Sequence, residues 1–302
     1  MDRLDAMATL LAAVDAGSLS GASRKLGMPL ATVSRKVSEL EAHLRMRLVT
    51  RTSRRLTLTD AGRSYVAACR RILEDIGEAE RAAAGEYSAP RGDLIITAPI
   101  VFGRLHVLPI VLEFLAAYGE IDIRLMLVDR VVNLQEDHVD VAVRIGALPD
   151  SSLVATRVGS IGRVVCASPA YLAERSTPKK PGDLAGHDCI TFGGLTSPDA
   201  WMFGHDKSTV TVAVHSRLVV NTAEAAIDAA VAGLGITRVL SYQAENAIRA
   251  GALVRLLRAF EPIAAPVSLV HAGQGLVPLK LRAFLDFAAP RLKARLLQSI
   301  TP

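Results

Sequence analysis

The stretch that decides the fold of the first part of the chain is SLSGASRKLGMPLATVSRKVSELEAHL, residues 18–44. Two short helical patterns are separated by a Gly-Met-Pro break. The second pattern has one apolar stripe at helical spacing, formed by Val33, Val37, Leu40 and Leu44. The opposite face is small, polar and basic in its N-terminal half, where it carries Ala31, Ser34, Arg35 and Ser38.

A surface of this kind is typical of a helix that recognises DNA. The N-terminal residues of a recognition helix enter the major groove, where an Arg side chain pairs with guanine through two hydrogen bonds. Acidic side chains must stay clear of the phosphates, and Glu39 and Glu41 lie in the C-terminal half of the pattern. We therefore expect this helix to bind DNA, and we count the adjoining Lys36 among its DNA-binding residues.

The segments before this helix predict its support. An apolar pattern over residues 3–16 predicts an amphipathic helix that Gly17 ends. Ser20 is expected to cap a second helix, which Gly27 stops, and to lie with the DNA-binding residues. Two helices joined by a tight turn and followed by the polar helix form a helix-turn-helix pattern.

A basic ribbon is expected directly after the helix-turn-helix. Residues 47–59 read RLVTRTSRRLTLT, in which apolar pairs bracket the segment TRTSRR. We interpret this pattern as two short strands whose tip carries Arg51, Arg54 and Arg55. Such a wing would place three guanidinium groups on flanking phosphates or in the minor groove.

The order GSLSGASRKLG, ATVSRKVSELE and TRTSRRLTLTDAG resembles the LysR-type transcriptional regulators over the full chain. The resemblance implies a winged helix-turn-helix. It implies that the bases are reached by Ala31, Thr32, Ser34 and Arg35. It implies that the DNA backbone is held by Arg51, Ser53, Arg54 and Arg55. The family usually has a Gly near the position of Arg45, so a different geometry is open to the turn into the wing in this chain. A phosphate contact is also open to the Arg45 side chain.

The basic charge is concentrated in the same region. The 302 residues have a net charge of +5. Residues 16–59 contain nine Lys or Arg and two acids, whereas residues 89–302 contain 21 basic and 19 acidic side chains. A solvated basic face would by itself explain the charge. Its coincidence with the helix-turn-helix favours a polyanionic partner that is bound by the first part only.

The cysteines and the apolar runs predict a cytoplasmic protein. Cys69, Cys166 and Cys189 form no Cys-x-x-Cys pair and are expected to be buried apolar residues in a reducing compartment. No run approaches the ~20 apolar residues of a membrane helix. We therefore predict no membrane partner.

A long helix is expected over residues 61–86, capped by Asp60 and roughly 39 Å long. Its apolar stripes, which include Ile72, need a partner. The partner is either the helix's own domain or an antiparallel helix of a second subunit, and the resemblance favours the second. We expect a dimer or a tetramer, because two DNA-binding heads match two half-sites.

From residue 93 the pattern changes to strands that alternate with helices, which predicts an α/β sandwich with a largely parallel sheet. Helices are expected over residues 103–118 and 131–138. The resemblance implies an effector domain of two lobes, of the type 2 periplasmic-binding-protein type, in a chain that is α/β overall. The expected parts are a DNA-binding domain (1–59), a linker helix (60–87), a hinge (88–92), an effector domain (93–302), lobe I (about 93–160 and 267–302) and lobe II (about 161–266).

Ligands in such sheets bind at the carboxyl ends of strands and near helix N-termini. The effector-binding candidates are therefore Pro99, Ile100, Val101, Phe102, Asp129, Arg130, Arg144, Gly146, Phe192, Gly193, Asn221 and Thr237. Structural roles compete for some of them, because Asn221 suits a helix cap and Arg144 suits an ion pair with Asp129. The family often has Ser or Thr where this chain has Pro99, which argues against a hydroxyl grip on a carboxylate. We expect Phe102→Asp to remove effector binding and to leave the domain folded.

The motifs of common enzymes are missing from the sequence, since no P-loop, dinucleotide loop, nucleophile elbow or metal-binding spacing occurs. We predict a regulator that is not an enzyme and has no cofactor or metal. The alternative is a small-molecule-binding protein or an enzyme with a basic accessory head. The expected partners are double-stranded DNA, a small effector such as an organic acid or an aromatic metabolite, further copies of the chain, and RNA polymerase.

Overall fold

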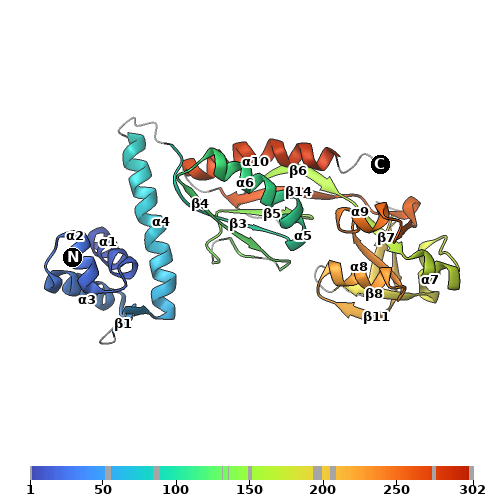
Figure 1. Cartoon of the computed structure of the whole chain (residues 1–302), viewed down its shortest axis with the longest axis horizontal. Coiled ribbons are helices and arrows are strands. Elements are labelled where there is room, and N and C mark those ends of the chain that lie inside the picture. Colours follow the sequence, from blue (N-terminus) through green and yellow to red (C-terminus); the bar gives the residue numbers. More distant parts are fainter. Residues whose placement is uncertain are drawn as a thin grey trace. The chain divides into compact units, whose positions relative to one another are not determined.

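The computed structural model describes residues 2–51, 56–83, 89–130, 132–134, 136–148, 152–192, 199–204, 209–273 and 277–298. The chain divides into two compact units, Met1–Ala89 and Pro90–Pro302 (Figure 1). The first unit contains the helix-turn-helix and the long helix. The second unit contains two lobes, each built around a five-stranded sheet.

The head of the first unit consists of three helices and a two-stranded antiparallel ribbon, namely α1 (Arg3–Asp15), α2 (Leu19–Leu26), α3 (Leu30–Leu44), β1 (Val49–Arg51) and β2 (Leu56–Leu58). The predicted stripe of α3 is confirmed, because Val33, Val37 and Leu40 are fully buried. The predicted cap of α2 is wrong. Ser18 Oγ accepts the N–H of Gly21 at 3.0 Å, so Ser20 is an exposed residue inside the helix.

The turn from α3 into the wing keeps a left-handed residue although it has no glycine. Arg45 caps α3 with φ 51°, a conformation that favours glycine, and Gly27 caps α2 with φ 62°. The Glu41 carboxylate accepts the N–H groups of Leu48 and Val49 at 2.8 and 3.1 Å. Glu41 therefore fixes the start of the wing, and the acid at this position has a structural role.

Helix α4 (Asp60–Ala83) begins one residue earlier than expected. Thr59 Oγ1 accepts the N–H of Gly62 at 2.9 Å, so Thr59 is the cap and Asp60 is the first helical residue. A Cβ atom at Gly62 would lie 1.9 Å from the carbonyl oxygen of Leu48. Only glycine therefore allows the helix to approach the wing this closely.

The first half of α4 packs against its own head. Val66 and Cys69 are buried, and Val66 belongs to the head's hydrophobic core. Ile72, one turn further along, remains 41% exposed. The first part of the apolar surface of α4 therefore packs against its own domain, as one interpretation expected. The exposed Ile72 leaves room for the other interpretation, a contact with a second subunit.

Lobe I contains a mixed sheet in the order β4-β3-β5-β14-β6, formed by β3 (Gly92–Ala98), β4 (Ile121–Leu127), β5 (Val141–Ile145), β6 (Leu153–Ile161) and β14 (Ala265–Ala272). Strands β4, β3 and β5 are parallel, whereas β14 is antiparallel to both neighbours. The helical elements of the lobe are α5 (Ile100–Phe102), a π-helical turn (Gly103–Val107), α6 (Leu108–Ala117) and α10 (Leu279–Gln298). Strand β14 and α10 come from the end of the chain.

Lobe II also has a mixed sheet, in the order β11-β8-β12-β7-β13, formed by β7 (Arg163–Ala167), β8 (Asp188–Phe192), β11 (His215–Val220), β12 (Ile236–Leu240) and β13 (Val254–Leu256). A separate hairpin pairs β9 (Ala200–Phe203) with β10 (Val210–Ala213). The helical elements are α7 (Pro169–Glu174), a 3-10 turn (Pro181–Gly186), α8 (Ala223–Val231), α9 (Ser241–Arg249) and a second 3-10 turn (Arg258–Phe260).

Several expected elements of the second unit differ from the observed ones. The predicted helix over residues 131–138 is wrong, because the described residues of this segment form turns. The apolar run at residues 209–221 is divided at Val214 between two sheets. Strand β6, hairpin strand β9 and helix α9 carry no clear pattern in the sequence. The sheets are mixed rather than largely parallel.

The helical segment Ile100–Ala117 is long and apolar enough to cross a membrane by length and composition. Its side chains Val107, Ile110 and Phe114 are buried in the core of lobe I. The apolar composition therefore has an explanation within the folded lobe.

Candidate functional site

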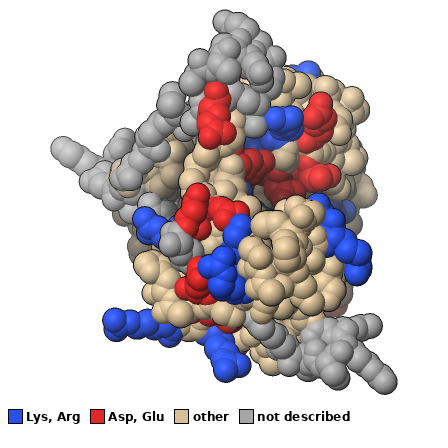
Figure 2. Space-filling view, turned by 90° about the vertical axis from the view of Figure 1, so that its left-hand side faces the viewer, with Lys and Arg blue, Asp and Glu red and all other residues tan. Residues whose placement is uncertain are grey.

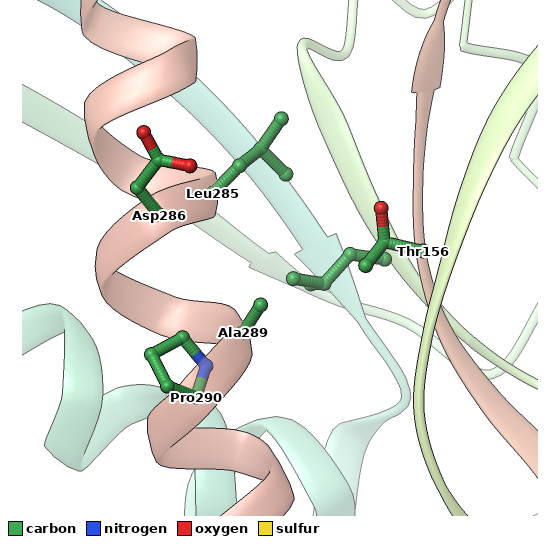
Figure 3. Close-up of a pocket in the computed structure, with 6 residues that line it drawn as sticks. Thr156, Leu285, Asp286, Ala289 and Pro290 are labelled. Carbon is green, nitrogen blue, oxygen red and sulfur yellow. The ribbon is translucent and has the colours of Figure 1, made fainter.

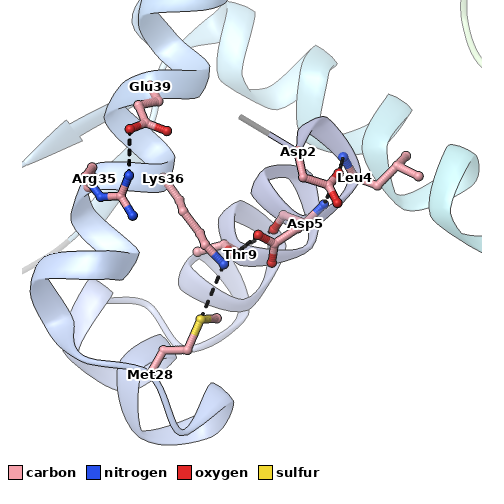
Figure 4. Close-up of polar contacts among 8 residues, drawn as sticks. All are labelled: Asp2, Leu4, Asp5, Thr9, Met28, Arg35, Lys36 and Glu39. Carbon is pink, nitrogen blue, oxygen red and sulfur yellow. Dashed lines mark hydrogen bonds and ion pairs between the residues drawn. The ribbon is translucent and has the colours of Figure 1, made fainter.

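The outer face of α3 is accessible. Ala31, Arg35 and Ser38 are exposed, and Thr32 and Ser34 are half-buried. The Arg35 side chain is 65% exposed, and its Nη1 atom lies 3.0 Å from Glu39 Oε1 (Figure 4). An exposed pair one helical turn apart contributes only a few tenths of a kcal/mol, about 0.3–0.5. The Arg35 guanidinium is therefore readily released to another acceptor.

Lys36 differs from Arg35, because it is engaged inside the head. Its Nζ atom lies 2.5 Å from Asp5 Oδ2 and 3.4 Å from Met28 Sδ, and its side chain is 18% exposed (Figure 4). These contacts connect α3 to α1 and to the turn before α3. The geometry assigns Lys36 to the packing of the head and does not place it with the exposed residues of α3.

A second set of predicted DNA-binding residues belongs to the wing. Val49 pairs with Leu58 and Arg51 pairs with Leu56 across the ribbon. Arg51 ends β1, but its side chain lies outside the described residues, as do Ser53, Arg54 and Arg55. In the view of Figure 2, basic and acidic side chains are interspersed around a surface without charged residues.

In lobe I, the candidates after β3 are largely taken up by packing. Val101 and Phe102 are buried. The Phe102 ring lies 5.6 Å from the ring of Tyr242, edge to face, and Tyr242 comes from α9 of lobe II. Ile100 N–H donates to Asp129 Oδ1 at 3.0 Å, so Asp129 holds the turn that begins with the half-buried Pro99.

A histidine that the sequence did not single out joins this junction between the lobes. The ring of His106 lies 4.7 Å from that of Phe102 and 5.7 Å from that of Tyr242. Its Nε2 atom is buried without a hydrogen-bond partner among the described residues. Burial lowers the pKa of His106; Arg295 acts in the same direction and Glu245 in the opposite one.

The other candidates of lobe I stay nearer the surface. Arg144 Nη2 donates to the carbonyl oxygen of Val132 at 2.6 Å, so the suggested pair of Arg144 with Asp129 is not formed. Burial lowers the pKa of the Arg144 guanidinium. Arg130 is exposed and lies 3.7 Å from Asp137. Gly146 has φ 123° and open space around its Cβ position.

The candidates of lobe II likewise include both buried and accessible residues. Thr237 is the second residue of β12 rather than the end of a strand, and its buried hydroxyl donates to the carbonyl oxygen of Ile190 at 3.1 Å. Asn221 is exposed, and the neighbouring Thr222 caps α8 in its place. Phe192 is half-buried at the end of β8, and Gly193 lies outside the described residues.

A cavity of about 230 Å³ lies between α10 and the sheet of lobe I, away from the predicted candidates (Figure 3). It is lined by Thr156, Leu269, Leu285, Asp286, Ala289 and Pro290. The cysteines are free and buried, as expected, and burial raises the pKa of the Cys166 and Cys189 thiols to about 12. The described residues contain no group of three or more His, Cys, Asp or Glu side chains that would hold a metal ion.

Comparisons with known proteins agree with this arrangement. Residues 4–63 match the bacterial regulatory helix-turn-helix protein model of the lysR family, and residues 88–293 match the LysR substrate binding domain. An HTH-type transcriptional repressor from Pseudomonas aeruginosa is 35% identical over 289 residues, which cover 95% of this chain and 91% of that protein.

Two solved structures have the same fold over nearly the whole chain. The structure of CrgA, a LysR-type transcriptional regulator from Neisseria meningitidis, has a TM-score of 0.60 at 30% identity and covers 95% of this chain and 98% of CrgA. The Vibrio cholerae virulence activator AphB has a TM-score of 0.60 at 28% identity, with 94% and 98% covered. The chain therefore belongs to the LysR-type transcriptional regulators, which are DNA-binding proteins with an effector-binding domain and are not enzymes.

Proposed function

We propose that α3 is the helix that reads the operator and that Arg35 is its main base-reading side chain. The observation that carries this proposal is the exposure of Arg35 on the face opposite the buried stripe of α3. Ala31, Thr32, Ser34 and Ser38 surround it and are small enough to let the helix enter the major groove. The Arg35 guanidinium exchanges Glu39 for the edge of a guanine.

The wing and the neighbouring basic residues are proposed to hold the phosphates. Arg51 is the last residue of β1, and Ser53, Arg54 and Arg55 follow it in the sequence. Contacts to phosphates fix the register of a protein on DNA without reading its sequence. Ser20, exposed on α2, is proposed as a further backbone contact.

The experiment that tests these two roles is a gel shift with the full chain. The probes are DNA from upstream of the protein's own gene and a scrambled duplex of equal length, each at several salt concentrations. We expect tighter binding to the upstream DNA, and a slope of log affinity against log salt that falls by roughly one in Arg54→Ala. Equal affinity for both duplexes would contradict the assignment of a reading helix.

The effector is proposed to bind between the two lobes of the second unit. Of the predicted candidates, Arg130 and Asn221 are exposed. Those that are half-buried are Pro99, Ile100, Asp129, Arg144, Gly146 and Phe192. Arg144 is without a carboxylate partner among the described residues, which favours an organic acid over a neutral aromatic metabolite. We propose a small acidic effector, a cytoplasmic location, and RNA polymerase as a partner in regulation.

We also propose that the protein acts as a dimer or a tetramer. Support comes from Ile72, which is 41% exposed on α4 beyond the part that the head covers. An Asp at this position would place a charge in an apolar helix pair, so Ile72→Asp should dissociate the dimer. Light scattering at micromolar concentration tests this expectation, and a wild-type protein that is monomeric there would exclude it.

A further inference from the structure

Two arginines of lobe II lie on the same face of neighbouring strands. Strands β7 and β12 are antiparallel, with Arg163 opposite Leu240 and Val165 opposite Arg238. Arg163 and Arg238 are therefore diagonal neighbours, and such positions lie about 7–8 Å apart, within reach of long side chains. The sequence does not indicate that they are a pair, because the two arginines are 75 positions apart and each is a single charge in an apolar strand.

The pair has no acid to balance its charge among the residues that the structure describes. Arg238 Nη1 donates to the carbonyl oxygen of Met202 at 3.0 Å, and its guanidinium lies 5.2 Å from the centre of the Trp201 ring. Neither arginine forms an ion pair with a described carboxylate. Other arginines of the same lobe do, with Arg175 and Arg217 on Asp188, Arg249 on Glu245 and Arg255 on Glu261.

The environment makes these two charges unfavourable without a counter-ion. Burial lowers the pKa of Arg163. Burial, and then the nearby charge of Arg163, lowers the pKa of Arg238 to about 10. Both side chains are still cationic at neutral pH. Like charges side by side destabilise a sheet, and a half-buried cation keeps a desolvation cost that a bound anion offsets.

The pair lies beside a crossing of the chain between the lobes. Ile161 ends β6 in lobe I, and Arg163 begins β7 in lobe II. The carbonyl oxygen of Gly162 between them accepts the N–H of Ser241 at 2.9 Å. Leu240, opposite Arg163, packs into the hydrophobic core of lobe I. An anion on the two guanidiniums would therefore be held at the seam between the lobes.

We propose that Arg163 and Arg238 form a binding site for a small oxyanion that carries two negative charges. A guanidinium group can donate two parallel hydrogen bonds to the oxygens of a carboxylate or a phosphate. The ring of the buried Trp201 lies against the Arg238 guanidinium and helps to position it. This inference rests on the effector binding proposed above and adds a chemical class and a residue pair to it. A dicarboxylate and a phosphate share the chemistry, and the experiment separates them.

The chain carries its own reporter for this site. Trp201 is the only tryptophan and lies against Arg238, so its fluorescence responds to a change at that guanidinium. The full chain without DNA is titrated with succinate, with inorganic phosphate and with chloride, at matched ionic strength. We expect a saturable change in fluorescence with succinate or phosphate and none with chloride.

Variants of one arginine locate the response. Arg163→Met leaves Trp201 and Arg238 in place and is expected to lower the affinity for the anion at least tenfold. Arg163→Lys keeps the charge but loses the planar guanidinium, so an intermediate affinity for the anion is expected. If Arg163→Met does not fold, the affinity of Arg163→Lys tests the role of Arg163. Arg217→Met, which removes an exposed arginine of the same lobe, is the matched control and is expected to keep wild-type affinity.

Each outcome bears on the proposal. A response to succinate alone identifies an organic acid, and a response to phosphate alone identifies a phosphate-bearing ligand. The proposal is overturned by an equal response to chloride, by no saturable response to either oxyanion, or by wild-type affinity in Arg163→Met and Arg163→Lys. Because DNA is absent from the titration, a failure of the operator assignment in the gel shift leaves this result unaffected.

Discussion

Helix α3 of the head and helix α5 of lobe I present opposite surfaces. On α3, Arg35 is 65% exposed and its neighbours on that face are small. On α5, Phe102 is fully buried and its ring contacts lobe II through Tyr242. A helix that binds a long polymer must keep one face free of its own fold. A helix at the start of a lobe is surrounded by strands, helices and the second lobe.

This difference separates what a substitution is expected to change. On α3, an outward side chain contributes to binding and little to stability. On α5, a buried side chain contributes to stability, and any effect on a ligand follows from the loss of packing.

Phe102→Asp is expected to unfold the second unit. Truncating a buried Phe costs about 3–5 kcal/mol, and the buried carboxylate adds to that cost. The sum reaches the whole stability of many domains, about 5–15 kcal/mol. Urea unfolding followed by circular dichroism measures the change, with the conservative Phe102→Leu as the control. A folded Phe102→Asp protein would mean that Phe102 lines open space, as the sequence alone suggested.

Arg35→Ala is expected to leave unfolding within about 0.5 kcal/mol of wild type, because the side chain is exposed and its pair with Glu39 is weak. Affinity for the specific DNA site should fall by about 1–3 kcal/mol, with one base preference relaxed. Arg70→Ala is the control, since it removes an equal charge from α4, where Arg70 pairs with Asp15. Equal losses of DNA affinity in both variants would show that Arg35 contributes only positive charge and does not read a base.

A pH dependence is expected from His106 at the lobe junction. Its pKa in the folded protein lies below the ordinary value of about 6.5, so the unfolded chain binds more protons as the pH falls through that value. The contribution of the neutral ring to stability is therefore present above the ordinary pKa and is lost as the pH falls towards the folded pKa.

Unfolding free energies of the wild type and of His106→Gln, compared between about pH 7.5 and about pH 5.5, measure this contribution. Arg295, Glu245 and Tyr242 surround the ring in both proteins, so their titration cancels in the difference. We expect the wild type to lose more stability on acidification than the variant does. An equal loss in both would show that His106 is solvated.

The smallest effects are expected where two helices of the head end. Arg45 holds φ 51° at the cost of about 1–2 kcal/mol for a residue with a Cβ atom, and the greater freedom of glycine in the unfolded chain offsets part of the gain. Arg45→Gly should therefore stabilise the head by about 0.5 kcal/mol. Gly27→Ala at φ 62° should destabilise it by about 1 kcal/mol, although nothing lies within 4 Å of the added atom. Thermal denaturation compares the two, and a loss of stability in Arg45→Gly would show that the Arg45 side chain makes contacts of its own.

The contacts that the sequence predicted correctly are local ones. The stripe of Val33, Val37 and Leu40 is buried because a helical period of 3.6 residues fixes one face without reference to the remainder of the chain. The strands of the wing follow from two apolar pairs around a basic turn. The ion pair of Lys36 with Asp5 could not be read from adjacent residues, because Asp5 lies on a helix 31 positions earlier.

The sequence by itself determined the family, the head and the two α/β lobes, because helical and strand periods and a basic wing are written in adjacent residues. Tertiary structure alone decided which side chains are accessible in the lobes. Phe102 and Thr237 are buried by elements far along the chain, and Arg163 meets Arg238 only through the register of β7 and β12. Burial and register depend on contacts between distant segments, and a one-residue shift in pairing reverses every side chain of a strand.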